Sequence, residues 1–244
     1  MVISASPQPS PAPLTQGGGR KLAQQVAERL EDEIVAAGWP VGTVIGSETE
    51  LIERFGVSRA VFREAIRVLE HHDVAYMRRG PGGGLVVKAP DSTAAVRAAA
   101  LSLGYRNATW EQIFEARSAL ELKCVEIASQ RIDEAGIARL REALAADEEA
   151  QKEGKVGSHD LHTILAELTG NPAFVLFIDV LTQLTRRPGA AEQPPSAAVE
   201  VRHAHSRIVE AVIAGDGALA RHRMHAHLDA MGPWIQPPVA EEAR

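Results

Sequence analysis

Three histidines in the second half of the chain could bind a metal ion together. His162, His205 and His227 each lie three or four residues from an apolar side chain in a segment with helical periodicity, so all three are expected to face a core. Neutral imidazoles are good ligands for Zn, Ni or Mn. A single inward histidine is more often an ordinary core residue, so the spacing alone leaves both interpretations open. The histidines expected at the surface are His203, His222 and His225.

Three arginines in the first half of the chain have the spacing of a basic helix face. Arg59, Arg63 and Arg67 recur every fourth residue, so they drift only about 80° around a helix axis. Arginine can clamp a phosphate and can also form two hydrogen bonds to a guanine edge in the major groove. The alternative is a solvated helix face, but it does not explain Gly56 or the Arg/Gly-rich run after position 78. The pattern therefore favours DNA binding.

The charge distribution is compatible with a DNA partner although the net charge is −6. Residues 1–90 carry ten basic and ten acidic side chains, whereas residues 91–244 carry sixteen and twenty-two. Within residues 54–79 there are six arginines and three acidic residues. Because salt screens distant charges, a DNA phosphate interacts with the nearest side chains rather than with the net charge of the whole protein. A local basic stripe is therefore sufficient for DNA binding.

Local sequence signals predict the elements that hold the arginines. Ser47 and Glu50 form a capping box, Gly56 ends the short helix that follows, and Ser58 is placed to cap the helix that carries the arginines. A glycine-rich run then joins two β-type segments, as in a hairpin. The expected elements are helices over 22–35, 48–55 and 58–72 and strands over 74–77 and 85–88.

The rest of the chain has helical periodicity only. Thr109 and Gln112 form a second capping box, and Asn171 with Pro172 provides an N-cap and a proline at the first helical position. No β pattern and no solenoid repeat appears, which favours an antiparallel helical bundle. The predicted fold class is mainly α: a winged helix-turn-helix of three helices and a β-hairpin wing, followed by an all-α antiparallel bundle. The expected ranges are a disordered tail 1–19, the winged helix 20–89, a linker 90–105, the bundle 106–233 and a tail 234–244.

The arginine segment resembles the recognition segment of GntR-family winged-helix regulators. The resemblance rests on Gly56-Val57-Ser58-Arg59 and Phe62-Arg63-Glu64-Ala65 and extends over nearly all of residues 20–88, into a wing at Arg79 and Gly80. It implies a transcriptional regulator, most simply a repressor, that binds a palindromic double-stranded DNA operator as a homodimer. Two departures are Thr49, where relatives often have an arginine, and Gly46, where they have a proline. The expected DNA-contacting residues are Ser47, Glu48, Thr49, Ser58, Arg59, Arg63, Arg67, Arg79 and Gly80.

Residues 106–232 resemble the all-helical FCD ligand domain of the FadR-like branch of that family. The resemblance implies that His162, His205 and His227 ligate a divalent metal, and that they and Arg117 hold a small organic acid effector. Relatives have an aspartate one turn before the first histidine, whereas this chain has Ser158 there; His159 is the other candidate for a fourth ligand. The alternative for Arg117 is a surface pair with Glu121, four residues on.

The rival hypothesis is a metal-dependent hydrolase that uses the His162, His205 and His227 cluster. It is disfavoured because the sequence has no HExxH motif and no carboxylate obviously beside the cluster. We therefore do not expect an enzyme. No run of eighteen apolar residues and no signal peptide is present, so neither a membrane partner nor export is expected, and the cytoplasm is the expected compartment. The single cysteine, Cys124, is expected to be buried and inert.

Overall fold

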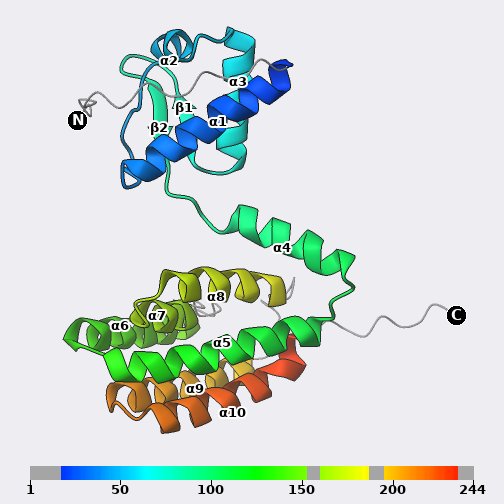
Figure 1. The fold of residues 1–244 in the computed structure, drawn as a ribbon. Coiled ribbons are helices and arrows are strands. Elements are labelled where there is room, and N and C mark those ends of the chain that lie inside the picture. The colour runs from blue at the N-terminus through cyan, green and yellow to red at the C-terminus, as the bar shows by residue number, and fades with distance from the viewer. Residues whose placement is uncertain (1–17, 153–159, 187–194, 236–244) are drawn as a thin grey trace, which may run out of the picture. The chain divides into compact units, whose positions relative to one another are not determined.

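The computed structural model describes residues 18–152, 160–186 and 195–235. It divides into two compact units, Met1–Ala94 and Ala95–Arg244 (Figure 1). The division falls within the range expected to be a linker. Most of the two expected tails lies outside the described residues.

The first unit has the expected three helices and hairpin. Its elements are α1 (Gly19–Ala36), α2 (Glu48–Phe55), α3 (Arg59–His71), β1 (Ala75–Arg78) and β2 (Gly84–Val87). The helix ends follow from local polar contacts. Ser47 Oγ accepts a bond from the backbone N–H of Glu50, whose carboxylate accepts one from the backbone N–H of Ser47, so the predicted capping box is confirmed. Ser58 caps α3 through a single bond, because its Oγ accepts from the backbone N–H of Val61 at 3.3 Å.

Helix α3 packs against α1 through an apolar face. The buried side chains of this face are Phe62, Ala65, Ile66 and Leu69. Val61 and Val68 lie only partly buried at the margin of this face. The side of α3 that carries Arg59, Arg63 and Arg67 is exposed to solvent.

The hairpin is antiparallel, with Ala75 opposite Val87 and Arg78 opposite Gly84. Strand β1 begins and ends one residue later than the predicted range 74–77, and β2 begins and ends one residue earlier than the predicted range 85–88. A segment that the sequence did not predict as a strand adds to the sheet: Val44 forms a β-bridge with Val86. Gly84 has φ 154, and a Cβ atom there would lie 2.5 Å from the carbonyl oxygen of Gly46, so only glycine fits this close approach.

The range predicted as a linker contains a helix. Helix α4 (Thr93–Tyr105) is rich in alanine and has no buried residue. Its apolar residues surround the axis instead of forming one stripe, so no amphipathic pattern marks this helix in the sequence.

The second unit is helical throughout its described residues, which confirms the mainly α fold. Helix α5 contacts α7, α8, α9 and α10 and runs through the middle of the bundle (Figure 1). The predicted Thr109 capping box begins α5, and Asn171 caps α8 with Pro172 in its first turn. None of the described helices is long and apolar enough to cross a membrane. The helices are α5 (Trp110–Arg131), α6 (Glu134–Lys152), α7 (Asp160–Leu168), α8 (Pro172–Thr185), α9 (Pro195–Ile213) and α10 (Gly217–Ile235).

Candidate functional site

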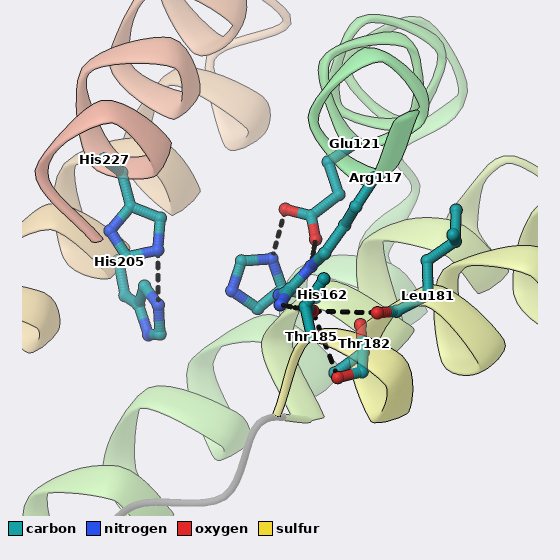
Figure 2. A network of polar contacts seen from close by, with 8 residues as sticks. All are labelled: Arg117, Glu121, His162, Leu181, Thr182, Thr185, His205 and His227. Carbon is teal, nitrogen blue, oxygen red and sulfur yellow. Dashed lines mark hydrogen bonds and ion pairs between the residues drawn. The ribbon is translucent and has the colours of Figure 1, made fainter. Parts of the chain in front are cut away.

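Three helices bring the predicted histidines together in the core of the bundle. His162 from α7, His205 from α9 and His227 from α10 are all buried, and one potential ligand atom from each lies within 4.8 Å of the others. The Nε2 atoms of His205 and His227 are 3.3 Å apart, and the ring of His162 turns toward them (Figure 2). The surface positions predicted for His203, His222 and His225 are confirmed.

Two of these imidazoles are neutral at physiological pH. Burial lowers the pKa of His205, and burial together with the neighbouring His162 and His205 lowers the pKa of His227 to about 2. A neutral imidazole keeps a lone pair on one ring nitrogen, which is the form that binds metals.

A buried ion pair lies beside His162. Arg117 Nε donates to Glu121 Oε1 at 2.6 Å, and Glu121 Oε2 lies 2.7 Å from His162 Nδ1 (Figure 2). Arg117 also donates to Thr185 Oγ1 at 3.0 Å. Burial acts to raise the pKa of Glu121, but His162 and Arg117 outweigh it and hold the pKa at about 2. Arg117 and Glu121 do form an ion pair, but the pair is buried in the core. The alternative prediction of a surface pair is therefore wrong about its position.

A second carboxylate approaches the cluster from α6. Asp147 Oδ2 lies 3.6 Å from Nδ1 of His205, slightly beyond hydrogen-bond length. That Nδ1 atom is buried and has no hydrogen-bond partner among the described residues. The expectation that no carboxylate lies beside the histidines was wrong, because Glu121 and Asp147 come from helices far from them in sequence.

One pair of histidine nitrogens has the spacing of two ligands on a divalent metal ion. Two nitrogen ligands of a tetrahedral Zn²⁺, each about 2.05 Å from the ion, lie about 3.3 Å from one another. The separation of the Nε2 atoms of His205 and His227 matches this value. The two candidates for a fourth ligand, Ser158 and His159, lie outside the described residues.

The arginines of α3 lie on one exposed face, as predicted. Arg59, Arg63 and Arg67 are all solvent-exposed. Arg59 Nε is 3.7 Å from a carboxylate oxygen of Glu48, and Arg67 pairs with Glu64 at 2.9 Å. Such exposed pairs contribute little and are readily exchanged for contacts with another anion.

The remaining residues of the predicted DNA set surround this face or form the hairpin loop. Thr49 is exposed, and the Ser47 and Ser58 hydroxyls accept the capping bonds already described. Arg79 and Gly80 are exposed in the loop between β1 and β2, where Gly80 has φ 95. Arg78 donates to the carbonyl oxygen of Gly82 at 2.9 Å and so braces the loop, a role that the sequence did not suggest.

Cys124 is buried against Ala166 and Ile178, and burial with the nearby Glu121 raises its pKa to about 12. We expect native protein at pH 8 to resist alkylation by iodoacetamide, because a pKa near 12 instead of 8.5 lowers the thiolate fraction about a thousandfold. Mass spectrometry with and without denaturant measures the modified fraction. Rapid alkylation of the folded protein would contradict a buried, inert thiol.

The fold and the two sites define a class of protein: a winged helix with an exposed arginine face, joined to a helical domain with a buried histidine cluster. Comparison with protein families agrees with this class. The profile described as "Bacterial regulatory proteins, gntR family" matches residues 22–87, and the FCD domain profile matches residues 112–230. The chain belongs to the GntR family of transcriptional regulators and carries an FCD effector-binding domain.

Individual relatives are bacterial regulators. The chain is 28% identical over 219 residues to the Exu regulon transcriptional regulator of Escherichia coli K12, covering 86% of this chain and 83% of the relative. It is 27% identical over 197 residues to the HTH-type transcriptional regulator LutR of Bacillus subtilis, covering 77% and 89%. The match to the Uxu operon regulator of Haemophilus influenzae, 26% identical, covers 65% of this chain and only 59% of the relative.

The fold has a solved counterpart. A Streptococcus agalactiae GntR structure aligns with a TM-score of 0.63 and 24% identity over 86% of this chain and 98% of that chain. These relatives are transcriptional regulators, and none of the comparisons supports the metal-dependent hydrolase.

Proposed function

We propose that this regulator binds a palindromic operator as a homodimer and responds to a small carboxylate held, together with a divalent metal, in the second unit. The observation that carries the proposal is the combination, in one chain, of an exposed arginine face on α3 and a buried histidine cluster flanked by Arg117. Because such a regulator acts on the chromosome, the cytoplasm of a bacterium is its proposed compartment.

The exposed face of α3 supports the DNA part of the proposal. Arg59 and Arg63 lie on the first two turns of a helix that follows a tight turn, which is the position of the base-reading side chains in helix-turn-helix proteins. Ser47 and Ser58 each accept a capping bond, and their hydroxyl hydrogens can donate to a phosphate. Glu48, Thr49 and Arg67 belong to the same proposed contact set.

Arg79 is proposed to contact phosphate from the wing, next to Gly80. We expect Arg79→Ala to weaken binding to operator and to unrelated DNA by a similar factor, because a phosphate contact positions the protein without reading bases. The slope of log K against log salt should become shallower by about 1. Fluorescence anisotropy at several salt concentrations measures both quantities. An unchanged slope would exclude this role.

The homodimer is proposed because two recognition helices are needed to contact two half-sites about one helical turn, roughly 34 Å, apart. Leu176 and Phe177 are exposed on α8 and offer apolar surface for a second copy to cover. Sedimentation of the full chain should give twice the mass of one chain, and a monomer at operator-binding concentrations would refute the proposal.

The proposed metal ligands are His162, His205 and His227, with Zn, Ni or Mn as candidates. When bound, the ion supplies positive charge and open coordination positions for an anion. The chain's own groups do the rest: burial excludes water, and Arg117 is fixed by Glu121 and Thr185 so that its guanidinium stays beside the cluster. These features support a carboxylate effector.

An effector screen tests the proposal on the full chain. Small dicarboxylates and sugar acids are added to the protein with Zn²⁺ and, separately, with a chelator, and the melting temperature and operator affinity are measured. The proposal expects at least one acid to raise the melting temperature more with Zn²⁺ than without it and to change operator affinity. If every acid acts equally with and without the metal, metal and effector are not coupled.

A further inference from the structure

The polar contacts around the histidines decide which ring nitrogen of each one carries a proton. His162 Nδ1 lies 2.7 Å from Glu121 Oε2. Glu121 also accepts a hydrogen bond from Arg117 Nε at 2.6 Å, as a carboxylate paired with a guanidinium does, so it is the acceptor for His162 as well and the shared proton is on Nδ1 of His162. With Nδ1 engaged by Glu121, Nε2 is the ring nitrogen of His162 that faces the other two histidines and is placed to bind a metal ion (Figure 2).

The same argument applies to His205 on the opposite side of the cluster. Its Nδ1 faces Asp147 Oδ2 at 3.6 Å, and its Nε2 faces His227. A shift of a few tenths of an ångström makes the contact with Asp147 a hydrogen bond. The proton then lies on Nδ1 of His205, and Nε2 presents a lone pair.

The tautomer of His227 follows from that of His205. The two Nε2 atoms are 3.3 Å apart, and only one of them can carry the hydrogen between them. Since His205 offers a lone pair, His227 donates from Nε2 in the metal-free protein. His227 is thus the one histidine of the three that must change tautomer to become a ligand.

From these contacts we infer that Glu121 and Asp147 are the positioning residues of the metal centre: each accepts the Nδ1–H of one histidine and turns that histidine's Nε2 lone pair toward a common point. The inference rests on the proposed metal binding. The two carboxylates behind the histidines would also supply negative charge close to an ion bound there.

The test compares matched aspartate variants of the full chain. Asp147→Ala removes the carboxylate behind buried His205. Asp229→Ala removes one that contacts His225 Nδ1 at 2.7 Å on the exposed face of α10, and so serves as the control. Glu121→Gln is the corresponding change behind His162. Zn²⁺ affinity is measured by competition with a chromogenic chelator, and apo stability by thermal melting.

We expect Asp147→Ala and Glu121→Gln to weaken Zn²⁺ binding by 10- to 100-fold, as loss of a carboxylate behind a metal-bound histidine typically does, and Asp229→Ala to have no effect. If Glu121→Gln fails to fold because it leaves Arg117 buried without its counter-ion, Asp147→Ala decides the matter. Equal Zn²⁺ affinity of Asp147→Ala and Asp229→Ala overturns the inference while leaving the metal proposal intact. Failure of the unaltered protein to bind Zn²⁺ overturns the metal proposal and the inference together.

A spectroscopic readout separates positioning from general stability. Long-range ¹H–¹⁵N correlation spectra of metal-free, ¹⁵N-histidine-labelled protein report the tautomer of each ring. We expect His162 and His205 to be protonated on Nδ1 and His227 on Nε2, and Asp147→Ala to change the pattern of His205 alone or of His205 with His227. A His205 ring protonated on Nε2 in the unaltered protein contradicts the inference.

Discussion

Replacing Arg59 or Arg63 by alanine should cost about 1 to 3 kcal/mol of operator binding each, which is roughly a tenfold to hundredfold rise in Kd. Both side chains lie on the exposed face of α3, opposite the apolar face that contains Phe62 and Leu69, so the fold should be unchanged. Specific binding is measured by fluorescence anisotropy on a short palindromic duplex taken from the DNA next to the regulator's own gene. Unrelated DNA serves as competitor.

Arg221→Ala is the matched control for these two substitutions. Arg221 is an exposed arginine on α10, in the second unit, so its removal changes the net charge equally. The control should bind the operator as the parent does. If Arg59→Ala and Arg63→Ala also bind like the parent, the arginine face does not read DNA.

Loss of one core histidine should abolish metal-dependent stabilisation. With free Zn²⁺ a hundredfold above Kd, the parent should gain about 2.7 kcal/mol, since binding to the folded state alone stabilises it by mass action. His205→Ala and His227→Ala should each lose most of this gain, because each removes one of three converging ring nitrogens. Calorimetric melting with and without Zn²⁺ measures the gain within each variant, so changes in apo stability cancel.

His225→Ala provides the control, because this histidine is exposed on α10 and close in sequence to His227. It should retain the full Zn²⁺ effect. Ser158→Asp should increase metal affinity by restoring an anionic ligand candidate near the first histidine. Equal stabilisation of the parent and of His205→Ala by Zn²⁺ would show that the metal binds elsewhere.

The parts of the fold that the sequence predicts well are those fixed by local chemistry. Helix α2 and helix α5 begin where their capping boxes are, because Ser47 with Glu50 and Thr109 with Gln112 satisfy backbone groups within four residues. The break at Gly56 is equally local, since its φ of 62 favours glycine. The inward positions of the three histidines also followed from periodicity.

The parts that the sequence does not predict depend on contacts between distant segments. Nothing local marks Val44 as the partner of Val86. Asp147 contacts His205 only because α6 packs against α9.

The sequence does contain a signal that Glu121 is buried. Glu121 lies four residues before Val125 and seven before Ala128, both fully buried, so it belongs to the apolar stripe of α5. An ionised residue in such a stripe needs buried partners, and Arg117 and His162 are those partners. The spacing of Arg117 and Glu121 alone fits a surface pair equally well.

The attachment of the hairpin has an evolutionary consequence. The hairpin is held to the rest of its unit by main-chain atoms: Leu85 N–H donates to the carbonyl of Gly46 at 2.9 Å, and Gly84 leaves no room for a side chain. None of these bonds depends on which side chains stand at the loop. Substitutions at Arg79 or on the outer face of α3 can therefore change the preferred operator while the scaffold persists. Duplicated copies of such a gene can acquire separate regulons by a few point mutations.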